Sequence, residues 1–166
     1  MEYNREVSVA FTGHQEYDGQ ADDRLAALVR SLYEEGYRFF YSGMALGFDL
    51  AAAEAVLSLR EECPGMQLIA VVPFHGQERD FPIRERMRYW AVLAAADRTV
   101  ELEPAYSRGC FYRRNDYLVD HADRLVAWYE RSRSGTGYTV RRARKERIEV
   151  TNLFEEVSMP MLFTVW

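Results

Sequence analysis

The sequence predicts an α/β fold with three layers, in which helices flank a mostly parallel sheet of about six strands. Short apolar runs rich in β-branched and aromatic residues alternate along the chain with segments of helical periodicity. Strands that alternate with helices form parallel sheets covered on both faces. The chain has 166 residues, 48% of them hydrophobic, which is enough for one domain with a sizeable core.

The first third of the chain predicts two strands, each followed by a helix. Val7–Thr12 is a short β-rich run. In Ala21–Glu35, leucine and valine residues recur at the spacing of one helix face, and Gly36 suits the helix C terminus. The apolar run Tyr37–Tyr41 predicts the second strand, and the alanine-rich segment Leu50–Arg60 predicts the second helix.

The middle third predicts two further strands around one helix. After the break at Pro64-Gly65, the run Leu68–Val72 predicts the third strand. Pro82 suits the first turn of a helix that extends to about Ala96, and its apolar spacing predicts an inward face of Ile83, Met87, Trp90 and Leu93 or Ala94. Arg98–Leu102 predicts the fourth strand.

The last third repeats the alternation. Phe111–Ala122 predicts a helix, Arg124–Tyr129 a strand, Ser132–Gly137 a loop, Thr139–Arg147 a basic helix and Ile148–Phe154 a sixth strand. We expect one domain over residues 1–166. Its apolar tail, residues 155–166, ends in MPMLFTVW and is expected to dock on the body or at a subunit interface, because it is too apolar to stay in water.

Composition limits the classes of function. Cys63 and Cys110 show neither metal-type spacing nor a disulfide framework, and no zinc-site pattern links His14, His75 and His121. No segment resembles a signal peptide or a membrane span, so we expect a cytoplasmic location and no membrane partner. The net charge of −5 argues against broad nucleic-acid binding, although a local basic patch would be compatible with it.

Polar and glycine-bearing loops follow four of the predicted strands. They are Gly13-His14-Gln15, Ser42–Asp49, Phe74–Glu78 and Ser134–Thr136. Ligands of open α/β sheets bind beyond the carboxyl ends of the strands. The sequence therefore predicts a binding cleft where these loops converge.

Two of these loops have the chemistry of an anion site. Ser42–Asp49 carries two glycines before a predicted helix, so backbone N–H groups could reach a phosphate there; an ordinary turn is the alternative. Asp49 could cap that helix, accept a ribose hydroxyl or do both. Gly135-Thr136, with the hydroxyls of Ser134 and Thr139, has the same geometry and the same simple alternative of a cap and turn.

Other side chains could contribute charge or proton transfer. Arg114 could hold a phosphate bidentately, or it could simply be solvated. Glu78 follows the third strand and could act as a general base, and His14 and His75 could contact a ligand. The chain contains neither a P-loop nor the G-x-G-x-x-G fingerprint, which leaves kinase and dehydrogenase chemistry with little support.

Six motifs in order carry a resemblance to a known family: Thr12-Gly13-His14, Ser42-Gly43-x-x-x-Gly47-Phe48-Asp49, Pro73-Phe74-x-Gly76-Gln77-Glu78, Phe111-x-x-Arg114-Asn115, Val119-Asp120-x-x-Asp123 and Ser134-Gly135-Thr136-x-x-Thr139. Over about residues 7–152 the chain resembles the YpsA-like family of uncharacterised bacterial proteins. That family belongs to the SLOG superfamily, so the resemblance implies a Rossmann-like domain that binds nucleotides or related ligands at its glycine-rich loops.

Two better-known relatives imply competing functions. The DNA-processing protein DprA (Smf), which binds single-stranded DNA, has similar loops, but this chain has Asp116 where that family has a second arginine. A DNA groove would use Arg113, Arg114, Arg141, Arg142 and Arg144. The LOG cytokinin-activating phosphoribohydrolases use an arginine that resembles Arg114 and a glutamate where this chain has Tyr138.

We therefore expect a homodimer that binds a nucleotide or nucleotide-derived small molecule, as a sensor or regulatory module. The alternatives are a LOG-like hydrolase of nucleoside monophosphates and DprA-like binding of single-stranded DNA. We assign no metal and no cofactor beyond a nucleotide-like ligand, and catalysis stays open, with Glu78 and Arg114 as its candidates. The predicted ligand-binding residues are Thr12, Gly13, His14, Ser42, Gly43, Gly47, Asp49, Phe74, Arg114, Asn115, Ser134, Gly135, Thr136 and Thr139.

Overall fold

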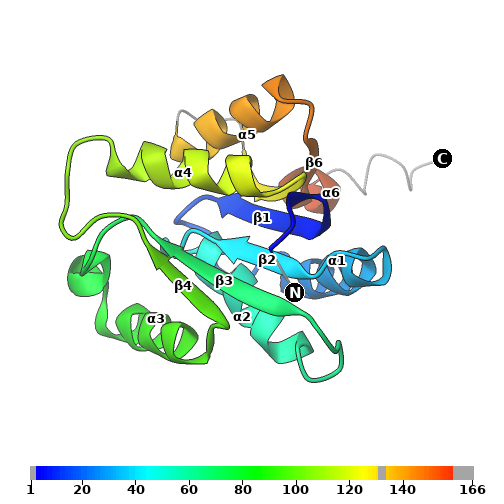
Figure 1. Ribbon diagram of the computed structural model, residues 1–166, viewed down its shortest axis with the longest axis horizontal. Coiled ribbons are helices and arrows are strands. Elements are labelled where there is room, and N and C mark those ends of the chain that lie inside the picture. The colour runs from blue at the N-terminus through cyan, green and yellow to red at the C-terminus, as the bar shows by residue number, and fades with distance from the viewer. Residues whose placement is uncertain (1–2, 131–133, 159–166) are drawn as a thin grey trace.

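The computed structural model describes residues 3–130 and 134–158. Six strands form one open sheet in the order β4-β3-β2-β1-β5-β6, and all five pairings are parallel (Figure 1). The strands are β1 (Ser8–Gly13), β2 (Phe39–Ser42), β3 (Gln67–Val72), β4 (Arg98–Glu101), β5 (Arg124–Trp128) and β6 (Glu149–Asn152). This arrangement confirms the predicted Rossmann-like α/β fold.

Helices connect the strands and cover the sheet on both faces. They are α1 (Asp22–Glu34), α2 (Phe48–Leu59), α3 (Ile83–Ala95), α4 (Cys110–His121), α5 (Gly135–Lys145) and α6 (Leu153–Ser158), with short 3-10 turns η1 (Arg5–Val7) and η2 (Gln77–Asp80). Figure 1 shows α4 and α5 on one side of the sheet and α1, α2 and α3 on the other.

Two hydrophobic clusters fill the space between these layers. Along β2, Phe40 belongs to the cluster beneath α1 and α2, whereas Phe39 and Tyr41 belong to the cluster beneath α4 and α5. Successive side chains of a strand point to opposite faces, so each fully buried strand contributes to both clusters. The apolar runs of the sequence arise from this double burial.

The sheet has a topological switch point between β1 and β5. From β1 the chain proceeds outward through β2 and β3 to β4, and it then returns to place β5 on the other side of β1. In the β1–β5 register, Gly13 lies opposite Trp128 at the carboxyl ends. Crevices at such points are the usual ligand sites of open α/β sheets.

Gly13 allows α2 to begin directly against the end of β1. A Cβ atom added to Gly13 would lie 2.4 Å from both Cβ and Cγ of Phe48, the first residue of α2. Phe48 is fully buried and packs edge-on against Phe11 and Tyr17. The position of α2 therefore depends on the missing side chain at Gly13.

The predicted boundaries need two corrections near the C terminus. Helix α5 starts at Gly135 rather than at Thr139, because Ser134 caps it: the Gly137 N–H donates to the Ser134 Oγ at 3.2 Å. Strand β6 ends at Asn152, and Leu153 and Phe154 begin α6 rather than extend the strand. Leu153 is buried and Phe154 packs against Trp128, so their apolar character serves α6 instead.

The predicted inward face of α3 is wrong for Ile83, Met87 and Trp90, whereas Leu93 packs against a hydrophobic cluster as predicted. Ile83, Met87 and Trp90 are 60%, 61% and 50% exposed, while Tyr89 and Val92 are buried. Arginines on the flank of α3 bind partners on the body: Arg88 pairs with Glu54 of α2, and Arg86 donates to the Phe81 carbonyl. These contacts fix the rotation of the helix and leave its apolar stripe, Ile83, Met87 and Trp90, facing outward.

The expected docking of the tail falls largely outside the described residues. Residues 155–158 complete α6, and residues 159–166 lie beyond the described part of the chain. Within residues 3–130 and 134–158, each helix is too short or too polar to cross a lipid bilayer.

We expect Gly13→Ala to destabilise the fold by about 1–3 kcal/mol, because the added methyl group overpacks the β1–α2 junction. Urea unfolding followed by circular dichroism measures this change. Gly135→Ala is the matched control, since the atom closest to its added Cβ would be the Asn115 Nδ2 at 3.4 Å. Equal stability of the two variants would contradict the packing role of Gly13.

Candidate functional site

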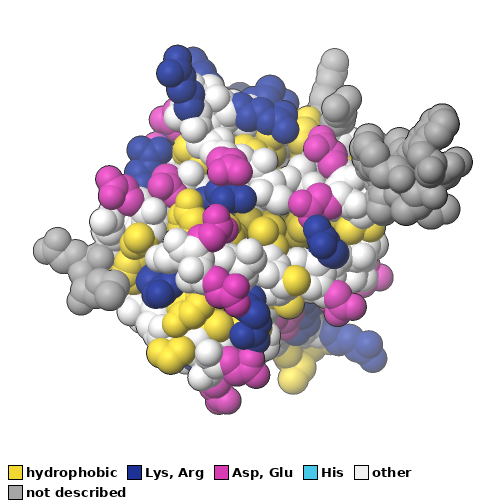
Figure 2. Space-filling model, turned by 90° about the vertical axis from the view of Figure 1, so that its right-hand side faces the viewer, with side chains coloured by type: hydrophobic (Ala, Val, Ile, Leu, Met, Phe, Trp, Pro, Cys, Tyr) yellow, Lys and Arg dark blue, Asp and Glu magenta, His cyan; other side chains and the backbone are white. Residues whose placement is uncertain are grey.

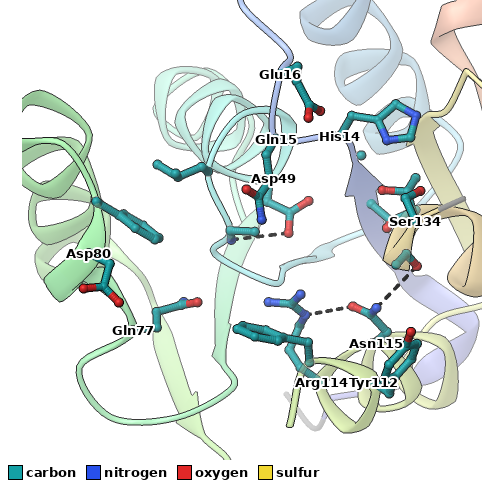
Figure 3. A pocket seen from close by; sticks show the side chains of 18 of the residues that line it. His14, Gln15, Glu16, Asp49, Gln77, Asp80, Tyr112, Arg114, Asn115 and Ser134 are labelled. Carbon is teal, nitrogen blue, oxygen red and sulfur yellow. Dashed lines mark hydrogen bonds between the residues drawn. The ribbon is translucent and has the colours of Figure 1, made fainter. Parts of the chain in front are cut away.

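A cavity of about 730 Å³ opens at the carboxyl edge of the sheet, over the switch point (Figure 3). This volume lies within the range of small-molecule sites, roughly 300–1,000 Å³. Its walls come from the loops that follow the first five strands and from the first turns of α2, α4 and α5. Of the predicted ligand-binding residues, ten line it: Thr12, Gly13, His14, Asp49, Phe74, Arg114, Asn115, Ser134, Gly135 and Thr136.

Arg114 places a buried positive charge in one wall. Its side chain extends from α4 and is only 6% exposed. Its Nη1 donates to the Gly43 carbonyl at 2.7 Å, and its Nε donates to the Asn115 Oδ1 at 2.8 Å. The Asn115 Nδ2 in turn donates to the Gly135 carbonyl at 3.4 Å. This chain of contacts connects the loop after β2 with the start of α5.

Asp49 places a buried carboxyl group across from this guanidinium (Figure 3). The expectation that Asp49 caps its helix is wrong, because Gly47 is the cap residue and Asp49 lies inside the first turn of α2. The Ala45 N–H donates to the Asp49 Oδ2 at 3.4 Å, whereas the buried Oδ1 has no partner among the described residues. Burial raises the pKa of this carboxyl to about 6, although Arg114 opposes that rise.

The N terminus of α5 presents backbone N–H groups that have no hydrogen-bond acceptor among the described residues. Ser134 accepts the N–H groups of Gly137 and Tyr138 through its side chain and its carbonyl, which leaves those of Gly135 and Thr136 without an intrahelical acceptor. The first turn of α5 contains no acidic residue. A helix N terminus of this kind favours an anion.

Four predicted ligand-binding residues shape the cavity without lining it. Ser42 holds the loop, since its Oγ donates to the Asp49 carbonyl at 2.8 Å and accepts the Met44 N–H. Gly47 packs against the backbone of the loop after β1, with its potential Cβ 2.4 Å from the Gln15 carbonyl oxygen. Thr139 is buried and donates to the Gly135 carbonyl at 2.9 Å.

Gly43 is the fourth of these supporting residues. A Cβ atom there would lie 2.6 Å from the Arg114 Cδ and 3.0 Å from the Asp49 Oδ2. The glycine therefore allows both charged side chains to approach the same stretch of backbone. The contact that the structure shows for Gly43 is the hydrogen bond that its carbonyl accepts from Arg114, and its predicted contact with a phosphate stays a prediction.

Three residues were candidates for proton transfer or ligand contact: Glu78, His75 and His14. Of these, His14 alone lines the cavity. Glu78 lies in η2 and does not line the cavity, so it does not face Arg114. His75 is exposed and pairs with Glu101 at 3.0 Å. His14 lines the cavity, and its Nε2 accepts the Glu130 N–H at 3.0 Å, which positions the imidazole ring.

Half of the lining residues were not among the predicted ligand-binding residues. Gln15, Ala45, Leu46 and Gln77 lie in loops that the sequence did place at the cleft. The others lie outside those loops: Glu16, Asp80, Phe81, Tyr106, Phe111 and Tyr112. Tyr106 lies in the loop that follows β4, and the rule that selected the other strand-end loops would have selected this one as well. Within the described residues, no three histidine, cysteine or acidic side chains lie together as a metal site would require.

Comparison with known proteins finds relatives that match most of this chain. The uncharacterised SPβ prophage-derived protein YoqJ of Bacillus subtilis is 31% identical over an alignment of 137 residues, which covers 74% of this chain and 80% of YoqJ. The UPF0398 protein YpsA of the same organism is 28% identical over 153 residues, covering 84% of this chain and 85% of YpsA.

A solved structure of the DNA processing protein A (DprA) from Helicobacter pylori has a similar fold, with a TM-score of 0.63 and 21% identity over 88% of this chain. This chain spans 64% of that DprA chain and 49% of the DprA chain from Streptococcus pneumoniae, so it corresponds to a part of each. The family described as the YspA SLOG family (YpsA) matches residues 11–159. The chain belongs to this YspA SLOG family.

Proposed function

We propose that this protein binds a nucleotide or nucleotide-derived small molecule in the cavity, as a sensor or regulatory module. One observation carries the proposal: the N terminus of α5 and the buried guanidinium of Arg114 face the same cavity. Both favour an anion, and Arg114 keeps its Nη2 without a hydrogen bond to the described residues. A phosphate at this point would receive the free donors of Gly135 and Thr136.

The carboxyl group of Asp49 suits the sugar of such a ligand. Its Oδ1 is buried without a partner, and a buried oxygen of this kind is stabilised when a ligand hydroxyl donates to it. Other Rossmann-like proteins also bind phosphate at a helix N terminus and a ribose hydroxyl with a carboxylate. Here the helix N terminus is that of α5, and the carboxyl group is that of Asp49 in α2.

Hydrolysis of a nucleoside monophosphate, the LOG-like alternative, has less support. The position of the LOG glutamate is occupied by Tyr138, whose hydroxyl donates to the Asp116 Oδ1 at 2.7 Å and which does not line the cavity. Asp49 is the buried carboxyl group that faces Arg114, so a reaction in this cavity would use Asp49 rather than a residue of α5.

Binding of single-stranded DNA, which the name of the Helicobacter pylori structure gives to that DprA, also has less support here. Two arginines of the expected basic groove are already paired with acidic residues: Arg113 pairs with Glu103, and Arg142 pairs with Asp116 and Asp120. Figure 2 shows acidic and basic side chains interspersed on the face opposite the cavity. Non-specific DNA binding depends on unpaired positive charge.

The proposal includes a homodimer in the cytoplasm. The outward stripe of α3, formed by Ile83, Met87 and Trp90, supports the dimer, because contiguous exposed apolar side chains are typical of subunit interfaces.

Thr136→Val should remove most of the thermal stabilisation that 5′-nucleotides give to the protein, since it deletes a hydroxyl group beside the free N–H groups of α5. We expect an affinity loss of about tenfold, or about 1.4 kcal/mol, from differential scanning fluorimetry with AMP and GMP. Thr99→Val, in exposed β4, is the control and should bind as the parent does. Parental binding by Thr136→Val would refute the anion site.

Asp49→Asn should stabilise the protein at neutral pH while weakening nucleotide binding. The pKa of Asp49 is higher in the folded chain than its usual value of 3.8, so the folded state binds the extra proton and stability falls as pH rises from about 4 through 6. The asparagine variant should lack this fall and gain up to about 3 kcal/mol at pH 7.

Chemical denaturation from pH 4 to pH 8 measures this difference between the parent and Asp49→Asn. Asp23→Asn, an exposed residue in the first turn of α1, is the control. A parallel pH dependence of the parent and Asp49→Asn would contradict the proposed burial of the charge.

The dimer is tested by sedimentation velocity at micromolar concentration. We expect the parent to sediment as a dimer and Met87→Glu to sediment as a monomer, because a charge on the apolar stripe must be desolvated on association. Arg84→Glu changes the charge of an exposed residue of the same helix and should stay dimeric. A monomeric parent would exclude the dimer.

A further inference from the structure

Three aromatic side chains form a cluster at one end of the cavity. This end is formed by the loops that follow β3 and β4 and by the start of α4. Phe74 follows β3, Tyr106 follows β4, and Phe111 lies in the first turn of α4. The ring centroid of Phe74 is 5.6 Å from that of Tyr106 and 6.0 Å from that of Phe111, and the rings of Tyr106 and Phe111 are 6.4 Å apart. All three line the cavity.

This aromatic cluster does not fill the interior of the protein. None of its three members belongs to the two hydrophobic clusters that pack against the sheet. Tyr106 is 64% exposed and Phe111 is 44% exposed. Large apolar side chains that gather in a concave surface without serving the core are typical of ligand sites.

The aromatic cluster is continuous with the anion site. The guanidinium carbon of Arg114 lies 5.7 Å from the ring centroid of Phe111, within the range of a cation–π contact. On its other side Arg114 reaches Asn115, which contacts Gly135 at the start of α5. A ligand that spans the cavity therefore meets free backbone donors at one end and aromatic rings at the other.

We propose that Phe74, Tyr106 and Phe111 form a stacking subsite for the planar base of the nucleotide, and that the subsite selects bases with an exocyclic amino group. This inference rests on the proposed function. Stacking on aromatic rings suits every base, because every base has a π-face. An inorganic phosphate or a sugar phosphate has no group that could use the cluster.

Selection among the bases comes from two acceptors that line the same cavity. The Gln77 Nε2 already donates to the Met44 carbonyl at 3.1 Å and lies 3.4 Å from the Tyr89 hydroxyl, which leaves its Oε1 to accept. The Asp80 carboxylate is an acceptor only. Figure 3 shows Gln77 and Asp80 on the same wall. Adenine, guanine and cytosine can offer the two hydrogens of an exocyclic amino group to such a wall. Uracil offers only its N3–H, between two carbonyl oxygens that the acceptors would repel.

Isothermal titration calorimetry with AMP, GMP, CMP, UMP and ribose 5-phosphate tests the inference. We expect at least one of the three nucleotides with amino-bearing bases to bind about tenfold or more tightly than ribose 5-phosphate, and more tightly than UMP. The double variant Tyr106→Leu, Phe111→Leu should lose this advantage and bind ribose 5-phosphate as the parent does. The Tyr3→Leu variant, which changes an exposed aromatic residue outside both the cavity and α3, should retain it.

The outcomes separate this subsite from the anion site. If nucleotides and ribose 5-phosphate bind equally well to the parent, and Thr136→Val weakens both, the proposed function stands and the aromatic subsite is wrong. If UMP binds as tightly as the other nucleotides while the double variant loses them all, stacking stands and the amino selection is overturned. If none of the five probes binds, the proposed function and the subsite fail together.

Discussion

The buried guanidinium of Arg114 is the interaction on which the cavity depends. A charge with 6% exposure needs several hydrogen-bond partners, and this one takes them from two different segments, Gly43 and its neighbour Asn115. Because Asn115 also contacts Gly135, the guanidinium couples the loop after β2 to the start of α5. Gly43 must lack a side chain for the same reason, since a Cβ would collide with the Arg114 side chain.

Burial of the Asp49 carboxyl group in the cavity wall destabilises its charged form. This burial raises the pKa of the carboxyl group, and one of its oxygens has no partner among the described residues. The charge of Arg114 offsets part of this cost through space, since none of the ion pairs among the described residues joins Arg114 to Asp49. Unsatisfied buried groups persist in proteins where function selects for them, and a ligand hydroxyl would satisfy this one.

The sequence was sufficient for the strands and for bringing ten of the predicted residues to one cavity, because both follow from local patterns. Strands that are buried on both faces of the sheet have continuous apolar sequences. Parallel strands place the loops at their carboxyl ends along one edge of the sheet. The face of α3 was not predictable from periodicity, which identifies an apolar stripe but not whether a neighbour covers it. There the contacts of Arg86 and Arg88 fix the rotation instead. Likewise, the support given by Gly43 to Arg114 joins residues far apart in sequence.

The location of the anion site at α5 follows from the charges at the helix N termini. In many nucleotide-binding folds the phosphate meets the first helix, yet here α1 carries Asp22 and Asp23 in its first turn, and α2 carries Asp49. These carboxylates already use the partial positive charge of their helices and would repel a phosphate. Helix α5 has no acidic residue in its first turn and begins beside β1 at the switch point. The absence of the G-x-G-x-x-G fingerprint is therefore compatible with the proposed nucleotide site, in which the helix that follows β5 would bind the phosphate.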